Sequence, residues 1–223
     1  MRSNHAQIVL AGFVAITAAA CAGFKGGWKS VAYVGEAPSE TVVNEAEKGL
    51  INGRSKLALP GAQLEVEIDN RLRTYDMHVY LFVLPLWWNP RDVYAENHDE
   101  GWTRVYLTIT PSDSSFVFRP TEAVLRMESG RFPGARGFEF GIWNESGQRI
   151  TEGQGWAHRP LASDVALDVP GRRYHLSIDF ETPVPSPKSQ QIELDLSRAL
   201  VSPEHPETPV IRFAPVRWKL GYT

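Results

Sequence analysis

Strict alternation of apolar and charged residues is the feature that most limits how this chain can fold. In LEVEID (64–69), Leu64, Val66 and Ile68 alternate with three acidic residues, and IELDLS (192–197) repeats the pattern. A period of two places successive side chains on opposite faces of a strand, so each segment is expected to be a half-buried β-strand. Helical periodicity is almost absent, so the pattern indicates a β-protein.

Further strands are expected after Gly61, separated by turns rich in Gly, Pro, Asn and Asp. The expected segments are 77–84, 104–110, 116–118, 123–127, 138–143, 173–180 and 211–220. About eight to ten short strands without amphipathic helices between them favour an antiparallel sandwich over a parallel α/β sheet. We therefore predict an all-β, antiparallel immunoglobulin-like β-sandwich over residues 61–223, with "immunoglobulin-like" describing architecture only.

The last expected strand changes phase. Ile211 and Phe213 have one parity, whereas the apolar residues after Pro215 have the other. An extra residue at Ala214–Pro215, as in a β-bulge, would restore the facing of the strand. Proline at this point also favours an edge or bulged position.

The first 20 residues have the layout of a secretory signal peptide. Arg2 lies in a short polar lead, an apolar run covers 8–20, and small residues end it. The run is too short to cross a bilayer comfortably, which takes about 20 apolar residues. Residues 21–60 are expected to form an extended, glycine-rich tether with a possible short strand or helix.

The only cysteine of the 223 residues is Cys21. The preceding residues 18–20 fit an ordinary A-x-A cleavage site, which would leave a free thiol. Together with Cys21 they also resemble a bacterial lipobox, although Ala18 stands where Leu is commonest. A lone thiol in an oxidising compartment invites mispairing, so lipidation of Cys21 is favoured. The resemblance implies a lipid anchor in the cell envelope, and Ala22 implies sorting to the Gram-negative outer membrane.

Two later segments extend this resemblance. An apolar strand leads into LPLWW (84–88), and FRPTEAVL (118–125) follows. Over roughly residues 60–130 the chain is similar to uncharacterised proteobacterial β-sandwich lipoproteins. That similarity implies no activity.

The stretch 87–102 is the strongest candidate for a contact surface. It is longer than most hairpin connections and combines aromatic rings with carboxylates, which can seat a partner or stack on a sugar. The candidate residues are Trp87, Trp88, Tyr94, Asp99 and Trp102. Alternatively, Trp87 and Trp102 cap the end of the sandwich.

Catalytic and metal chemistry is not expected. His175, Ser177 and Asp179 share one strand face, but neighbours on a face are about 6.6 Å apart along the strand, whereas nucleophile and base must approach to about 3 Å. The acidic residues of 92–99 do not match a calcium-binding loop. We predict no enzyme activity, metal or cofactor.

The function expected is that of a non-enzymatic, lipid-anchored envelope protein that docks another envelope or surface component. The alternative is a glycan-binding module that uses the aromatic stretch 87–102. Removal of residues 1–20 takes away one positive charge, so the formal net charge moves from −3 to −4. There is no basic cluster in the sequence, and nucleic acid is not expected as a partner.

Overall fold

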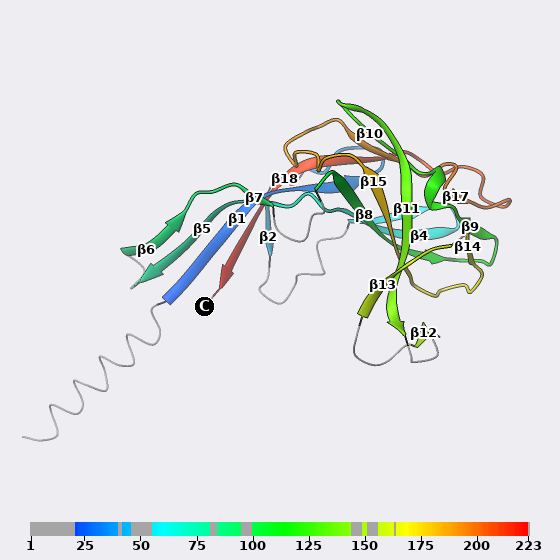
Figure 1. Ribbon diagram of the computed structural model, residues 1–223, viewed down its shortest axis with the longest axis horizontal. Coiled ribbons are helices and arrows are strands. Elements are labelled where there is room, and N and C mark those ends of the chain that lie inside the picture. The colour runs from blue at the N-terminus through cyan, green and yellow to red at the C-terminus, as the bar shows by residue number, and fades with distance from the viewer. Residues whose placement is uncertain are drawn as a thin grey trace, which may run out of the picture.

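The computed structural model describes residues 21–39, 42–45, 55–80, 84–94, 100–143, 149–150, 156–162 and 164–222 (Figure 1). These residues form 18 β-strands and one 3-10 turn, with no α-helix among them. The predicted all-β, antiparallel sandwich-like class is confirmed, with more strands than expected. In the part of the chain that is described, no helix has the length and apolar character needed to cross a membrane.

The elements follow one another in chain order with these bounds: β1 (Cys21–Tyr33), β2 (Val42–Glu45), β3 (Ser55–Leu59), β4 (Ala62–Ile68), β5 (Leu72–Tyr80), β6 (Leu84–Asn89), β7 (Val93–Tyr94), β8 (Trp102–Pro111), β9 (Phe116–Phe118), η1 (Pro120–Glu122), β10 (Val124–Met127), β11 (Gly130–Trp143), β12 (Arg149–Ile150), β13 (Trp156–Pro160), β14 (Val165–Leu167), β15 (Tyr174–Glu181), β16 (Ile192–Asp195), β17 (Leu200–Val201) and β18 (Ile211–Tyr222).

One large sheet curls to make most of the fold. Its strands follow the order β3-β4-β8-β15-β11-β10-β16-β18-β1-β5-β6, and β14-β9-β17 form a second, small sheet. The long strand β11 joins the two layers, because its start pairs with β10 and its later part pairs with β15 and β13. The register shifts between Gly134 and Arg136, where a Cβ on Gly134 would lie 2.1 Å from the carbonyl oxygen of Pro120. A glycine therefore lets β11 bend closely around η1.

The core lies between the two layers and confirms the alternation seen in the sequence. Strand β4 buries every second residue, and β15 and β16 bury the apolar positions predicted for them. The largest fully buried core side chains include Leu64, Leu107, Ile109, Phe118, Leu125, Leu176, Ile178, Phe180 and Phe213.

Part of the sheet extends beyond the sandwich (Figure 1). We call residues 21–28, 42–45, 75–80, 84–89 and 216–222 the arm, and the remaining described residues the body. Within the arm β1 pairs with β18 on one side and with β5 on the other. Residues 21–33 of the expected tether are thus a sheet strand with two neighbours.

Close strand packing explains the glycines that suggested a flexible tether. A Cβ on Gly27 would lie 1.8 Å from the carbonyl oxygen of Leu72 and 2.9 Å from the Cα of Arg73. Because those atoms belong to the backbone of β5, only glycine allows this approach. The register of β1 against β5 also shifts between Gly26 and Gly27.

Strand β18 keeps one register with β1 from Arg212 to Tyr222, so the predicted bulge at Ala214–Pro215 is wrong. The phase change has another cause, because β18 runs from the body into the arm and buries a different face in each. Ile211 and Phe213 belong to the body core, whereas the arm buries Val216, Trp218 and Leu220. Pro215 lies between the segments of β18 that pair with β16 and with β2.

The connection between β4 and β5 fixes the arm to the body. Asn70 is fully buried, and its Nδ2 donates to Ser30 Oγ at 2.9 Å and to the carbonyl oxygen of Pro185 at 3.3 Å. The Arg71 guanidinium lies 3.8 Å from the ring centroid of Trp218. These contacts join β1, β18 and the 183–191 segment at one point, which we call the junction.

Candidate functional site

The structure divides the stretch 87–102 among three strands. Trp87 and Trp88 lie on β6, where they pair with His78 and Met77 of β5. Tyr94 ends β7, and Trp102 begins β8. Asp99 lies outside the described residues. What the sequence suggested to be one long loop is therefore partly strand, and its aromatic residues are distributed between the arm and the body.

Tyr94 is an exposed aromatic residue beside the junction. It pairs with Leu72 at the start of β5, and its side chain is 39% exposed. The neighbouring Val93 is equally exposed. Tyr94 therefore retains the accessibility that a contact residue needs.

Trp102 belongs to a cluster on the outer face of the body, which we call the Trp102 cluster. Its members are Trp102, Arg104, Arg136, Phe138, His158 and Asp179. The Arg136 guanidinium lies 3.7 Å from the Trp102 ring centroid, a cation–π contact that covers one face of the indole. A charged side chain from β11 thus holds the Trp102 ring in place. The ring lies on the face formed by β8, β15 and β11.

Asp179 organises the cluster from the strand between its two arginines. Its carboxylate is 2% exposed and accepts hydrogen bonds from Arg104 Nε at 2.6 Å and from Arg104 Nη2 at 2.9 Å. Arg136 Nη2 donates to the same carboxylate at 3.1 Å. The hydrogen bond to Asp179 raises the pKa of Arg104. The bidentate contact fixes the guanidinium of Arg104, and the single hydrogen bond together with the Trp102 ring orients that of Arg136.

His158 lies among aromatic rings at the other side of the cluster. Its ring centroid is 4.7 Å from that of Phe140 and 6.1 Å from that of Tyr106. Burial lowers the pKa of His158, and the positive charge of Arg104 lowers it further, so both favour the neutral imidazole. Among the described residues, His158 Nε2 and the nearby Ser177 Oγ have no hydrogen-bond partner.

The three polar residues of β15 do not assemble a catalytic triad. Asp179 binds two arginines, and His175 Nδ1 lies 3.1 Å from Thr108 Oγ1 on β8. Ser177 Oγ is buried without a partner among the described residues, so it has no base to activate it. The bonds run between strands, as on the polar face of a sheet.

A second polar cluster, which sequence reasoning did not find, joins two turns of the body. Asp113 Oδ2 lies 2.9 Å from His205 Nε2, and Asp113 Oδ1 accepts from the backbone N–H of Ser115 at 2.8 Å. The His205 ring stacks on Phe116 at 5.5 Å. Ser115 Oγ bonds to Asp113 and to Ser202, and not to the imidazole. The cluster therefore fastens the turns and lacks the contact of a serine nucleophile with a base.

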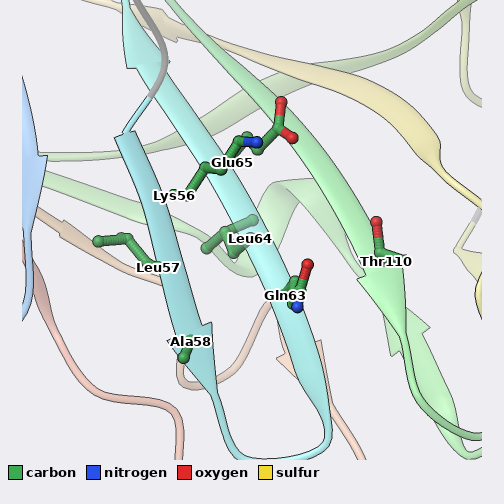
Figure 2. A pocket seen from close by; sticks show the side chains of 7 residues that line it. All are labelled: Lys56, Leu57, Ala58, Gln63, Leu64, Glu65 and Thr110. Atoms are coloured by element: carbon green, nitrogen blue, oxygen red, sulfur yellow. The ribbon is translucent and has the colours of Figure 1, made fainter.

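A shallow hollow of about 200 Å³ lies on the β3–β4 hairpin and β8 (Figure 2). The strand pairing places Lys56, Gln63, Glu65 and Thr110 on its outer face, whereas Leu64 turns into the core. Ligand pockets usually hold about 300–1,000 Å³ and bury most of their ligand. This hollow is smaller and offers no converging buried polar groups among its lining residues.

Within the described ranges, no group of three or more His, Cys, Asp or Glu side chains is placed to hold a metal ion. Of the stretch 92–99 that was considered for calcium, residues 95–99 lie outside those ranges.

The position of Cys21 is set by the pairing of β1. Cys21 lies opposite Tyr80, and Gly23 lies opposite Tyr222, so β1 begins where β5 and β18 end. Cys21 thus lies at the free end of the arm (Figure 1).

No protein-family model, curated protein or solved structure matches this chain, so no relative supplies residue roles that could be carried over to it.

Proposed function

We propose that this chain is a non-enzymatic lipoprotein of the bacterial cell envelope, anchored in the outer membrane through Cys21, whose body docks another envelope or surface component. The observation that carries the proposal is the position of Cys21 at the free end of the arm. An acyl group there would extend away from the body without disturbing its core.

The arm makes such an anchor mechanically useful. Each buried CH₂ of an acyl chain contributes about 0.8 kcal/mol, and two or more chains hold a protein stably on a membrane. At about 3.3 Å per residue, residues 21–28 span roughly 26 Å. Because Asn70 and Arg71 fasten the arm at the junction, the body would be held at a defined distance from the acylated cysteine.

The Trp102 cluster and Tyr94 supply the proposed docking surface. Trp, Tyr and Arg are the residue types most often found at the energetic centres of interfaces. Asp179 already orders Arg136, whose side chain is 44% exposed, and Arg136 orders the Trp102 ring. Side chains that are ordered before binding lose less conformational entropy when a partner arrives.

The anchor is tested by mass spectrometry of the N-terminal peptide of protein purified from its own membranes. We expect the peptide to begin at Cys21 and to carry acyl chains. Cys21→Ser should allow high salt to release the protein from the membrane pellet, whereas wild-type protein should stay in the pellet. An unmodified Cys21 in membrane-bound wild-type protein would refute the anchor.

Docking is tested by cross-linking in intact cells, followed by capture and quantitative mass spectrometry. Trp102→Ala and Tyr94→Ala should each reduce the yield of a stoichiometric partner by tenfold or more, a loss of roughly 1.4 kcal/mol or greater. Val169→Ala is the matched control, because Val169 is an exposed apolar residue of the body, 44% accessible, outside the cluster. Equal capture by all variants would remove the cluster from the docking model.

The glycan alternative has a separate signature in the same proteins. If no partner is captured but added saccharides shift tryptophan fluorescence in wild type and not in Trp102→Ala, the surface binds a sugar. No shift with any saccharide would reject that alternative.

A further inference from the structure

One face of the arm gathers aromatic and cationic side chains. Residues directly opposite in an antiparallel pair share a face of the sheet. Along β1 and β18, Phe24 pairs with Gly221, Gly26 with Lys219, and Trp28 with Arg217. On the other side of β1, Phe24 pairs with Met77 and Gly26 with Tyr75. We call Phe24, Trp28, Tyr75, Met77, Arg217 and Lys219 the basic aromatic face.

Burial shows that this face is the open one. Phe24 is 42% exposed, and Arg217 and Lys219 are exposed as well. On the opposite face of the same strand, Trp218 and Leu220 are buried. One face of the arm is therefore buried in β18, and the other presents aromatic and cationic groups.

The charge of the open face is positive although the chain as a whole is acidic. Arg217 lies 4.9 Å and Lys188 5.9 Å from the Trp28 ring centroid. No acidic residue occupies the positions of β1, β5 and β18 that form the basic aromatic face. Asp76 pairs with Lys25 on the opposite face and accepts from Arg73 at 2.9 Å. Against a formal net charge of −3, these cations are a local excess.

We propose that the basic aromatic face rests on the anionic phospholipid surface next to the anchor. Lysine and arginine are attracted to lipid phosphates, and aromatic rings favour the headgroup level of a bilayer. Phe24 follows Cys21 by three positions on the same strand, so an anchor at Cys21 brings this face within reach of the membrane. This inference rests on the proposed function for its location in the cell, and the vesicle test below does not depend on acylation.

An acidic protein surface would satisfy the same cations, but it would not explain the rings between them. A bilayer interface takes up exposed Phe24 and half-buried Trp28 without the need for a shaped pocket. A single lipid chain gives marginal attachment, and basic groups beside it supply the second contribution. The lipid surface is therefore the occupant that fits both the rings and the charges.

The test uses the full chain carrying Cys21→Ser, so that no acyl group contributes, and sedimentation with large vesicles. We expect binding to vesicles of neutral phospholipid with 30% anionic phospholipid, and little binding to neutral vesicles. Each cation near an anionic membrane contributes about fivefold in affinity, so Arg217→Gln with Lys219→Gln should weaken binding about 25-fold. Raising the salt concentration should weaken it as well.

The matched control removes two exposed cations from the body. Arg173→Gln with Arg198→Gln makes the same change in net charge and should leave vesicle binding unchanged. Circular dichroism of each variant checks that it is folded. Phe24→Ala should weaken binding to anionic vesicles without altering its salt dependence, because it removes an apolar contact and no charge.

The outcomes separate the two proposals. Equal binding to neutral and anionic vesicles, equal loss in both double variants, or binding to a soluble acidic polypeptide with none to vesicles would each overturn the membrane-facing role. If vesicle binding behaves as expected but Cys21 is unmodified in cells, the anchor fails and the basic aromatic face stands. If Cys21 is acylated but vesicles are not bound, the anchor stands alone.

Discussion

Replacing Asp179 with asparagine is the sharpest test of how the Trp102 cluster is held. Removing one partner of a buried ion pair typically costs about 3–5 kcal/mol. Here Arg104 is 24% and Arg136 is 44% exposed, so water screens part of the loss. We expect Asp179→Asn to lower the free energy of unfolding by about 2–3 kcal/mol, because two guanidinium groups lose their shared carboxylate.

The measurement is urea unfolding followed by circular dichroism. Thermal unfolding gives a second readout. For a chain of this size each kcal/mol of lost stability lowers the unfolding temperature by about 2–4 °C, so Asp179→Asn should lower it by roughly 4–12 °C. Glu65→Gln is the control, because Glu65 accepts two hydrogen bonds of 3.1 Å from Arg173, whose side chain is 57% exposed. Such surface pairs contribute under about 1 kcal/mol. If Asp179→Asn costs no more than Glu65→Gln, the buried carboxylate does not organise the cluster.

Two further predictions concern the arm and the turns of the body. Gly27→Ala should lower the free energy of unfolding in urea by about 2–3 kcal/mol, because the new Cβ would meet the backbone of Leu72. Gly221→Ala is the control and should change stability little, since its Cβ would have its nearest contact at 3.7 Å. Equal effects of the two substitutions would contradict the close approach of β1 and β5. The hydroxyl and backbone N–H of Ser115 hold the pKa of Asp113 below its usual value. The resulting stability is present above the unfolded-state pKa and is lost as the pH falls through the folded-state pKa. The stability gap between wild type and Asp113→Asn should therefore close in acid, and a gap that is constant from pH 7 to pH 2.5 would contradict this assignment.

The faces of the body strands could be predicted because alternation is a local property of the chain. Leu64, Val66 and Ile68 each needed only their neighbours in sequence to be assigned to the core, and all three are buried. The pairing partners could not be predicted in the same way. Asp179 meets Arg104 and Arg136 across 75 and 43 positions, and only the register of β15 with β8 and β11 brings them together.

The arm was missed for a different physical reason. Glycine is common both in flexible linkers and at points where two backbones approach closely, and sequence alone does not separate these uses. At Gly27 the second use applies. The phase change near Pro215 was interpreted as a bulge for a similar reason. An inserted residue and a change of buried face along one strand give the same pattern in the sequence.

The candidate site was anticipated in part. Trp102 and Tyr94 could be selected from the sequence as aromatic residues of the stretch 87–102. In the structure Tyr94 is exposed and Trp102 is half-buried. Arg136, which covers the Trp102 ring, gave no signal because its importance depends on a carboxylate from another strand. Asp113 and His205 are 92 positions apart and carry no motif.

The sharing of β18 between body and arm bears on how the chain matures. The strand pairs with β1 over residues 212–222, and it supplies Ile211 and Phe213 to the body core and Trp218 and Leu220 to the buried face of the arm, although β1 is made first and β18 last. Contacts between such distant segments form slowly, because a long loop must close before they stabilise anything. The pairing of β1 with β18 would therefore form only after nearly all of the polypeptide had emerged. A chain cut short before residue 211 would lack β18 and would expose the apolar residues that β18 covers to proteolysis.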